Sequence, residues 1–587
     1  MDLLSLFSTD RNVLLAITVC SLLLYGLTLN NGYSVDDYLV SEDLEMVDQG
    51  ISGIPEIVTS YYGKTDLGTP YAYRPVTRVT FAIERSLWGE RVWLSHLINV
   101  LLYALLSFLA FKLLIQIIGN EHRNLILIAI GLFVFHPIHT EVVCSLKNRE
   151  ELLSLLFVLT SSILMIKFID GSKLIWLVAA ILLFLLSLPT KVGNVPFAGI
   201  LVLSVFLFRK WNFKKLATAG LPYLAVFAGY LVTVYHFFPL YLRREFTPEE
   251  SPLMFVPSIW DRIPTGLGII PHYLRMVSFP HPLAFFYGYN QIEIMSWTNG
   301  FVWFGVGLVI FLSVMFFICI KKAPIVSFGI GIFGMGIAPF LNIIAGVPGI
   351  IAERWLLTPS LGFCLILAWL LHYMITRIGS KPVMVGLSLI LIGYSTRVLS
   401  RVPDWKSHKS LVYNDVKVVQ KSFVANFMAG KFYAADGYNS TSKQDRKENL
   451  ENSLFHYDIL IPIAQNQAEY QLRCAYLSRD LGEKEMALRY AINAFNSRSG
   501  RISYGIKPLA ILLELQQADK GIELSQQLVK EHSHKSAPQI FLGNFHLMAG
   551  DTLQAITEYE AVLNYSDIAP NFSAYLTNLK THVSSSD

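Results

Sequence analysis

The chain has 587 residues, of which 53% are hydrophobic, and a mean hydropathy of +0.46. These values exceed those of ordinary soluble domains, so a lipid bilayer is the expected solvent for much of the chain. The formal net charge is only +4, and its Lys and Arg residues form short clusters beside apolar runs. Such clusters indicate membrane topology and argue against a nucleic acid as partner. The five cysteines show no CxxC spacing, which argues against a disulfide framework or a zinc site.

Apolar runs long enough for membrane helices occupy most of the first 400 residues. A helix needs about 20 apolar residues to cross the hydrocarbon core, or somewhat fewer if its flanking residues snorkel. The first run lacks a small-residue cleavage signature and is expected to remain as a signal anchor. The sequence predicts eleven spans, at 12–29, 93–118, 124–137, 151–169, 173–188, 195–208, 218–238, 301–320, 324–345, 355–376 and 382–399.

Charge distribution predicts the orientation of these spans. With a cytoplasmic N-terminus, the basic loop 209–215, the Lys321–Lys322 pair and the turn 377–381 all lie inside, as the positive-inside rule requires. The polar stretches 30–92, 137–150, 239–300 and 346–354 and everything after Arg401 then lie outside the cytoplasm. Segment 259–278 is interrupted by two prolines, so it is predicted to lie at the outer interface rather than to span.

After about Arg401 the sequence changes to amphipathic helix with small residues at recurring positions. Ala487, Gly521 and Ala555 follow one another at intervals of 34 residues, which is the period of tetratricopeptide repeats. Three repeats fit this register, a degenerate unit is expected near 425–433, and the polar stretch 437–450 is predicted to be a loop. Such arrays bind extended peptides or partner helices, and a packing scaffold without a ligand is the alternative.

The first outer loop places two adjacent carboxylates, Asp36 and Asp37, just after the first span. Two neighbouring carboxylates are not both fully ionised at low cost in a low-dielectric cleft unless cations or hydrogen-bond donors accompany them. One of them is therefore a candidate general base. A solvated turn or a helix cap is the alternative.

A second polar connection, from 135 to 151, packs many ionisable groups next to the fourth span. Charged groups at that depth usually face a cavity and a partner. Lys147 or Arg149 is a candidate clamp for a phosphate, and His139 or Glu141 a candidate for sugar hydroxyls. His139 and Glu141 are also candidate metal ligands, although two ligands alone make a weak metal site. The alternative is that the ionisable residues of this connection are snorkelling anchors at the membrane surface.

Three more basic side chains share that predicted side of the membrane. They are Arg74 in the first loop, Lys191 after the fifth span and Arg354 at the start of the tenth. Several cations at one end of a helical bundle suit an anionic head group, such as a phosphate whose polyprenyl tail stays in the lipid. Each of them alone would be read as an interfacial anchor.

Several of these motifs resemble those of the transmembrane and tetratricopeptide-repeat-containing O-mannosyltransferases. The resemblance rests on His-Pro-Ile-His-Thr-Glu at 136–141, Ala-Glu-Arg-Trp-Leu-Leu-Thr-Pro-Ser-Leu-Gly-Phe at 352–363 and Asp-Trp-Lys at 404–406. Val-Asp-Asp at 35–37 and Tyr-Arg-Pro-Val-Thr at 73–77 fit as well. One departure is Val192, because members usually show Lys-Glu where this chain has Lys-Val. The resemblance covers nearly the whole chain.

This family implies an all-α fold, with a GT-C-type membrane bundle over 1–401 and a tetratricopeptide-repeat solenoid over 402–587. It also implies the roles of the candidate residues. Asp36 is the expected base, with Asp37 as neighbour and possible substitute. The implied phosphate-binding residues are Arg74, Lys147, Arg149, Lys191 and Arg354, and the implied sugar- or acceptor-binding residues are His139, Glu141 and Glu353.

The implied reaction moves a monosaccharide, with mannose as the expected sugar, from a polyprenyl phosphate to Ser or Thr hydroxyls of an acceptor protein. Asp36 would accept the hydroxyl proton in a single displacement that inverts the anomeric centre, while the cations stabilise the departing phosphate. No cofactor and no metal are expected, because a monophosphate donor carries no pyrophosphate to neutralise. The expected location is a bacterial inner membrane or the endoplasmic reticulum membrane, with the active site and the repeats on the periplasmic or lumenal side.

Two other classes of protein would share some of these features. A transporter or flippase of a lipid-linked anion also has many spans and buried charges, but such proteins usually show matching halves with broken helices near the midplane. A membrane-anchored repeat scaffold would leave the concentration of charge in the outer loops unexplained. Loss of transfer in a normally folded Asp36→Asn would support the enzyme over the transporter. Normal acceptor glycosylation in a strain that lacks the membrane part but keeps residues 402–587 would favour the scaffold.

Overall fold

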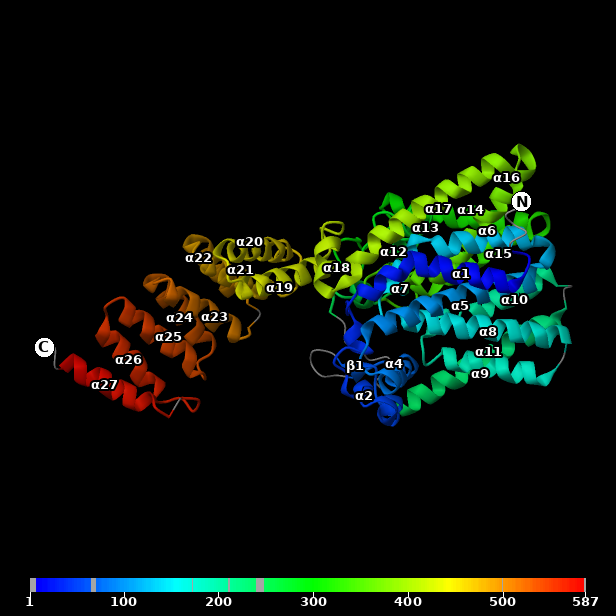
Figure 1. The fold of residues 1–587 in the computed structure, drawn as a ribbon. Coiled ribbons are helices and arrows are strands. Elements are labelled where there is room, and N and C mark those ends of the chain that lie inside the picture. The colour runs from blue at the N-terminus through cyan, green and yellow to red at the C-terminus, as the bar shows by residue number, and fades with distance from the viewer. Residues whose placement is uncertain are drawn as a thin grey trace. The chain divides into compact units, whose positions relative to one another are not determined.

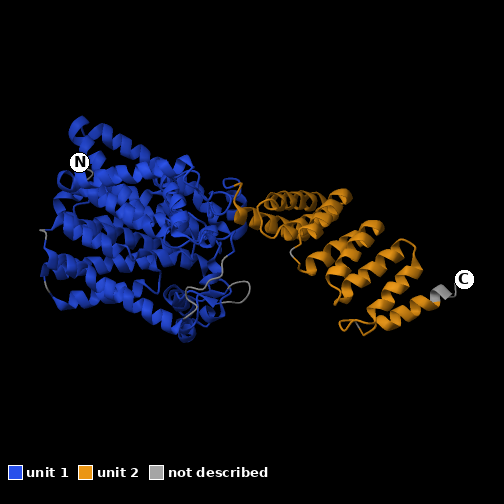
Figure 2. Cartoon of the chain, turned by 180° about the vertical axis from the view of Figure 1, so that it is seen from behind, with its two compact units in different colours: residues 1–419 blue, residues 420–587 orange. Residues whose placement is uncertain are grey.

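The computed structural model describes residues 7–64, 70–171, 173–209, 212–238, 247–498, 500–568 and 570–584. The chain forms two compact units, residues 1–419 and 420–587 (Figure 2). In the described part, strand structure is confined to one antiparallel pair, β1 (Gly63–Lys64) and β2 (Pro70–Tyr71). The predicted all-α membrane fold is confirmed. Residues Lys210 and Trp211 of the predicted basic loop lie outside the described residues.

The apolar helices of the first unit run along one another in a bundle (Figure 1). These helices, with the short 3-10 helices that adjoin or connect them, are α1 (Asp10–Tyr25), η2 (Gly26–Asn30), α5 (Val92–Ile118), η5 (Asn120–His122), α6 (Arg123–Phe135), η6 (Pro137–His139), α7 (Thr140–Cys144), α8 (Arg149–Gly171), α9 (Leu174–Ser187), η7 (Val192–Asn194), α10 (Phe197–Phe208), α11 (Phe213–Phe237), α14 (Gly300–Lys322), α15 (Pro324–Ile337), η9 (Ala338–Phe340), η10 (Glu353–Leu356), α16 (Leu357–Ile378), α17 (Ser380–Arg401) and η11 (Val402–Lys406).

Seven of these helical stretches are long and apolar enough to cross a membrane. An eighth would be the pair Asn120–Phe135 and Pro137–Cys144, which is bent by 50° where Pro137 interrupts the helix. Three further predicted spans are helices of the expected type but are shorter: Leu174–Ser187, Val192–Phe208 and Pro324–Phe340. Every predicted span therefore coincides with an apolar helix, but the structure gives seven or eight full-length spans rather than eleven. The orientation of the bundle in the membrane stays a prediction.

Shorter elements connect these helices. They are η3 (Asp37–Leu39), α2 (Glu45–Asp48), η4 (Gly50–Gly53), α3 (Ile54–Thr59), α4 (Pro75–Trp88), η8 (Pro252–Phe255), α12 (Ile259–Gly268), α13 (Ile270–Ser278) and α18 (His408–Asp415). The proline-interrupted segment 259–278 forms two short helices, and neither is among the candidate spans.

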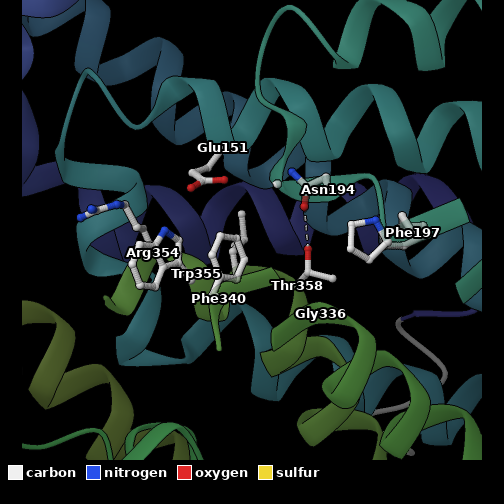
Figure 3. A pocket seen from close by; sticks show the side chains of 11 residues that line it. Glu151, Asn194, Phe197, Gly336, Phe340, Arg354, Trp355 and Thr358 are labelled. Carbon is white, nitrogen blue, oxygen red and sulfur yellow. Dashed lines mark hydrogen bonds between the residues drawn. The ribbon is translucent and has the colours of Figure 1, made fainter. Parts of the chain in front are cut away.

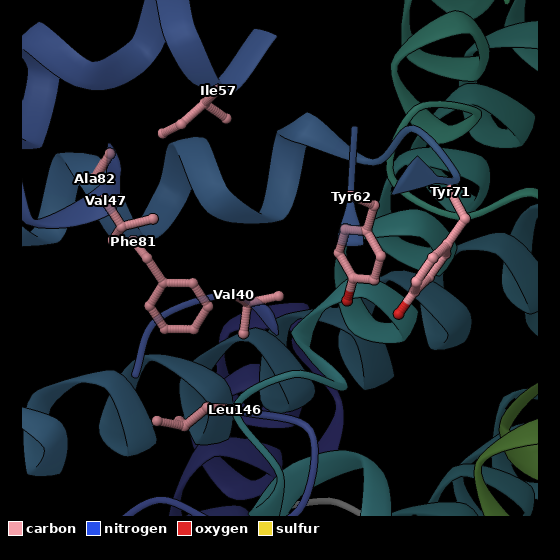
Figure 4. Close-up of a cluster of buried hydrophobic side chains, with 8 residues drawn as sticks. All are labelled: Val40, Val47, Ile57, Tyr62, Tyr71, Phe81, Ala82 and Leu146. Atoms are coloured by element: carbon pink, nitrogen blue, oxygen red, sulfur yellow. The ribbon is translucent and has the colours of Figure 1, made fainter. Parts of the chain in front are cut away.

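The first loop folds onto a small hydrophobic core of its own (Figure 4). The eight buried members of this core are Val40, Val47, Ile57, Tyr62, Tyr71, Phe81, Ala82 and Leu146. Leu146 comes from the distant connection before α8, so burial of these side chains holds that connection against the loop that carries Asp36. Hydrophobic packing thereby brings two predicted parts of the site together.

The second unit consists of antiparallel helix pairs. Its helices are α19 (Phe423–Asn439), α20 (Lys443–Leu460), α21 (Gln467–Asp480), α22 (Lys484–Asn496), α23 (Ser503–Glu514), α24 (Ala518–Glu531), α25 (Ser536–Met548), α26 (Thr552–Val562) and α27 (Phe572–Ser584). The three residues at intervals of 34 are buried at equivalent positions in α22, α24 and α26. A Cβ on Gly521 would lie 2.2 Å from the ring of Phe545, which explains the small residue there.

Two expectations for the C-terminal third need correction. The stretch 437–450 is not a loop: α20 begins at Lys443, and the Ser442 hydroxyl caps it by accepting a hydrogen bond from the Asp445 N–H. The second unit begins at 420 rather than 402. The segment between these positions packs with the membrane unit, where Asp415 forms an ion pair with Arg401.

Candidate active site at one end of the helical bundle

Asp36 lies in the turn between η2 and η3. Its backbone adopts the left-handed conformation, with φ of 68°, which Asp tolerates better than most residues. The side chain is half-buried. Within the described residues its carboxylate has no hydrogen-bond or ion-pair partner. A carboxylate without such partners is available to accept a proton.

Asp37 is the opposite case, because it is fully buried and fully bonded. Its two carboxylate oxygens accept hydrogen bonds from the N–H of Ser34 at 2.8 Å and the N–H of Lys147 at 2.8 Å, and from the hydroxyls of Ser34 and Ser145. Burial raises the pKa of Asp37 to about 7, and the main-chain donors of Ser34 and Lys147 limit that rise. Asp37 thus fastens the first loop to the connection before α8, and its predicted role as substitute base stays untested.

Three of the predicted phosphate-binding cations meet at one carboxylate, that of Glu150. Its Oε1 atom lies 3.0 Å from Arg74 Nη1, 3.1 Å from Lys147 Nζ and 2.7 Å from Lys191 Nζ. The side chain of Glu150 is fully buried, whereas that of Arg74 is 26% exposed. Lys191 also pairs with Glu151 at 2.7 Å. Segments that are far apart in the sequence therefore converge, as the spacing of charges predicted.

Lys147 is almost as enclosed as Lys191, with 10% and 8% of the side chains exposed. Burial lowers the pKa of Lys147, the carboxylate of Glu150 opposes that effect, and the neighbouring charges of Lys191 and Arg354 add to it. The charge of Asp36 also stabilises the ammonium form of Lys147. Lys147 is thus influenced by the charge of Asp36 as well as by the other cations.

Arg354 adds a fourth cation, held by Glu141. Its Nη1 donates to Glu141 Oε1 at 2.6 Å, and its main-chain N–H donates to Glu141 Oε2 at 2.8 Å. The guanidinium also lies over the ring of Trp355. Its side chain is 16% exposed, and the charge of Asp36 acts on it electrostatically. Arg354 and Asp36 therefore belong to the same electrostatic neighbourhood.

A pocket opens next to Arg354 (Figure 3). It is narrow, with a cavity volume of about 10 Å³, and lies between η7, the start of α10, the end of α15 with η9, and the start of α16. The rings of Phe340 and Trp355 stack in parallel with centroids 4.9 Å apart. The Thr358 hydroxyl donates to Asn194 Oδ1 at 3.0 Å, and Glu151 lines the pocket beside Arg354. The pocket thus combines an aromatic wall, an amide and a carboxylate.

The predicted phosphate contact of Arg149 needs correction. Its guanidinium is fully buried and donates to Asn99 Oδ1 at 2.7 Å, to the Ser95 carbonyl at 2.9 Å and to Glu84, with which it forms an ion pair. Its carbon Cζ also lies 3.8 Å from the ring centroid of Phe81. An arginine enclosed by such partners stabilises the fold and is not open to a ligand.

His139 and Glu353, two of the three predicted sugar-binding residues, are also corrected. Both ring nitrogens of His139 are occupied, at 2.7 Å from the Tyr103 hydroxyl and 2.8 Å from Ser360 Oγ. Glu353 is 1% exposed and accepts hydrogen bonds from the Ala284 N–H at 2.5 Å and the Tyr287 hydroxyl at 2.9 Å. The third, Glu141, lies in the site but is engaged by Arg354.

Sequence reasoning missed four residues of the site. Glu150 and Glu151 open the α8 helix, and an acidic pair directly before a long apolar run was the available signal. Asn194 and Thr358 lack such a signal, because isolated polar residues at helix ends are common. Among the described residues, no three His, Cys, Asp or Glu side chains are grouped as metal ligands. Metal independence stays a prediction.

Comparison with known proteins agrees with the resemblance that the motifs indicate. No family model matches the chain. It is 25% identical to the human protein O-mannosyl-transferase TMTC3 over 59% of this chain and 41% of the relative. It is 26% identical to the protein O-mannosyl-transferase F38B6.6 of Caenorhabditis elegans over 65% of this chain and 53% of the relative, and 24% identical to human TMTC4 over 62% and 56%.

The chain spans about half the length of the curated relatives it matches. The matched share of the chain is larger than the second unit alone, so it includes membrane helices as well. The resemblance indicated by the motifs is thereby confirmed: the curated relatives of this chain are protein O-mannosyl-transferases of the TMTC family, which are glycosyltransferases.

Proposed function

We propose that this protein transfers a monosaccharide, with mannose as the expected sugar, from a polyprenyl phosphate to Ser or Thr hydroxyls of proteins. The observation that carries the proposal is the unpaired carboxylate of Asp36, whose charge acts on the cations Lys147 and Arg354, at one end of an apolar helical bundle. Relatives named protein O-mannosyl-transferases support the reaction type.

In this reaction Asp36 accepts the proton of the acceptor hydroxyl as its oxygen attacks the anomeric carbon. The bond between that carbon and the phosphate oxygen breaks, and the electron pair leaves with the phosphate. Arg354, Lys147, Lys191 and Arg74 then stabilise the added negative charge. One displacement on one face of the sugar inverts the anomeric centre.

The donor phosphate competes with carboxylates for these cations. Glu150, Glu151 and Glu141 hold them in place without ligand and, together with Asp36, balance the four positive charges, so the site is close to neutral before the donor arrives. A bound phosphate adds negative charge that these cations can share, because Arg354 and Arg74 keep part of their guanidinium exposed. This arrangement favours a singly phosphorylated lipid over a pyrophosphate and needs no metal ion.

The pocket beside Arg354 takes the place of the corrected sugar-binding residues. Its stacked rings of Phe340 and Trp355 offer an apolar wall for the face of a sugar ring. Asn194 and Glu151 offer hydrogen-bond partners for hydroxyl groups. The cavity of about 10 Å³ has room for little more than a water molecule, so the sugar would lie against its mouth, with its phosphate toward Arg354 and its prenyl tail in the surrounding lipid.

The remaining features of the proposal concern location and acceptor. The membrane would be a bacterial inner membrane or the endoplasmic reticulum membrane, with the site and the repeats on the non-cytoplasmic side. The helical repeats of the second unit would engage the acceptor protein, since stacked helix pairs commonly bind extended segments.

The test is transfer by the purified full chain. The protein in detergent is incubated with polyprenyl phosphate mannose and Ser- or Thr-containing peptides, and the peptides are examined by mass spectrometry. We expect a mass increase of one hexose on a hydroxyl residue. No increase with mannose or any other polyprenyl phosphate sugar, together with movement of the lipid across proteoliposome membranes, would favour the transporter instead.

A further inference from the structure

The segment from Arg401 to Asp415 touches the Asp36 loop on both sides of Asp36. On the N-terminal side of Asp36, the Asn31 Nδ2 donates to the Val402 carbonyl at 3.2 Å, and the Gly32 N–H donates to the Lys406 carbonyl at 2.9 Å. After it, the Nε2 of His408 lies 3.1 Å from the Oε2 of Glu42. We call residues 401–415 the connecting segment, since they join the last apolar helix to the second unit in the chain.

The same segment also reaches the turn that carries Arg354. Asp415 Oδ2 accepts a hydrogen bond from the Phe285 N–H at 2.7 Å. The preceding N–H, that of Ala284, donates to Glu353. Glu353 is the neighbour of Arg354 in η10. Two consecutive main-chain N–H groups thus join the connecting segment to the Arg354 turn.

Arg401 is the cation that holds this arrangement together. It forms an ion pair with Asp415, whose Oδ2 lies 2.7 Å from Arg401 Nη2, and its Nη1 lies 3.0 Å from Asp404. It also attracts Glu353 electrostatically. Arg401 and Asp415 are both essentially fully buried. Without Asp415 the buried Arg401 would keep only Asp404 as an ion-pair partner, so the Arg401–Asp415 pair stabilises this arrangement.

Asp36 itself has no side-chain contact in the described residues that fixes its carboxylate. Its position is therefore set by the main chain on either side, through Asp37 and through the anchors on the connecting segment. The position of the Arg354 side chain depends in the same way on the position of the turn that carries it. One segment thus contacts both loops on which the proposed chemistry depends.

We infer that residues 401–415 are a positioning element, in which Arg401 and Asp415 fix the Asp36 loop and the Arg354 turn relative to each other. The catalytic part of this inference rests on the proposed function. Arg401 and Asp415 would not touch the substrate, and would act through the backbone of residues 31–42 and of residues 284–285 and 353–354.

The experiment compares the full-length protein with Asp415→Asn, His408→Ala and Asp10→Asn. Asp415→Asn removes the charge opposite Arg401, and His408→Ala removes a partly exposed anchor whose loss the fold tolerates more easily. Asp10→Asn is the matched control, because Asp10 also pairs with two cations, Lys112 and Arg123, but lies at the start of α1, at the other end of that helix from the Asp36 loop.

Hydrogen exchange of the detergent-solubilised proteins gives the first readout, independent of any activity. We expect Asp415→Asn to speed exchange in peptides covering 30–42, 283–287 and 352–357, and His408→Ala to speed it in 30–42. Asp10→Asn is expected to leave all three unchanged. Faster exchange confined to 401–419 in Asp415→Asn would overturn the inference, whether or not the protein proves to be a transferase.

Transfer kinetics give the second readout. A misplaced reacting group costs on the order of 10²-fold in rate, so Asp415→Asn should lower kcat per folded molecule by about 10- to 100-fold. In the Asp36→Asn background it should have little further effect, because both changes act on the same step. An equal loss in both backgrounds would mean general destabilisation and contradict the positioning role. Absence of transfer by the wild type would reject the proposed function alone.

Discussion

The neighbouring residues Arg149 and Glu150 belong to two different clusters of charged side chains in the membrane unit. The two clusters differ in the partners and in the exposure of their charged groups. Arg149 belongs to a sealed network in which Glu84, Asn99 and Ser95 satisfy its guanidinium. Glu150 is the centre of a cluster whose three cations come from three different segments and remain partly exposed at Arg74. Successive helical residues point to different faces, so adjacent charges in one motif can have different roles.

This comparison shows that a charged group is recognised as structural or ligand-binding by the number of its partners and by its exposure. The position of the residue in a sequence motif does not distinguish the two roles. The Arg149 network is predicted to determine stability. The Glu150 cluster, with Arg354 and Asp36, is predicted to determine transfer.

The largest effect is expected for Arg149→Gln, which tests the stability half of the comparison. Removing the cation leaves Glu84 buried without its partner, and breaking such a pair costs about 3–5 kcal/mol. Thermal or denaturant unfolding in detergent should show this loss. The folded fraction should keep its donor KM, and a raised donor KM with normal stability would place Arg149 among the ligand-binding cations.

Arg354→Gln tests the other half, through its effect on transfer by the folded protein. Losing one preorganised donor to developing charge typically costs about 10²–10³-fold in rate. We expect kcat/KM per folded molecule to fall by about 10²-fold, in addition to a loss of stability because the buried Glu141 loses its ion-pair partner. The matched control is Arg377→Gln, at the opposite end of α16, which should transfer normally. Equal activity of the two variants would remove Arg354 from the site.

The smallest effect is expected for the pH dependence of stability that Asp37 causes. Asp37 is the residue that fastens the first loop to the connection before α8. The pKa of Asp37 is raised from 3.8 to about 7 in the folded protein, so the folded state holds the proton more tightly than the unfolded chain. Its contribution therefore makes stability fall as pH rises from about 4 to 7.

Unfolding measured across this range should show a decline in the wild type that is smaller in Asp37→Asn. The variant should also be less stable at every pH, because each carboxylate oxygen accepts a main-chain N–H and an amide can accept only one of them. Parallel pH profiles for the two proteins would contradict the raised pKa.

Much of the fold could be predicted from sequence because it depends on local composition. Apolar runs give helices wherever they occur, and the interval of 34 residues identified the buried small positions of the repeats. The polar helix α20 was not predicted, because its Ser and Lys residues are typical of a loop. Ser442 followed three residues later by Asp445 was a capping signal that outweighed this composition.

The candidate site was harder to predict, because it depends on which charges meet. Sequence alone suggested that distant cations converge, and Arg74, Lys147 and Lys191 do so. It could not distinguish Arg149 from them, since the partners of Arg149 at Glu84, Ser95 and Asn99 come from other helices. The pocket with Asn194 and Thr358 arises only from the packing of helices that carry no motif.

The most direct test of the central claim is a single-turnover comparison of the wild type with Asp36→Asn, using bound polyprenyl phosphate mannose and an acceptor peptide. Loss of a general base typically costs about 10²–10⁴-fold, so the account predicts a loss of that size in the transfer rate, with unchanged donor binding and unfolding midpoint. A rate close to that of the wild type would contradict the assignment of Asp36 as the base.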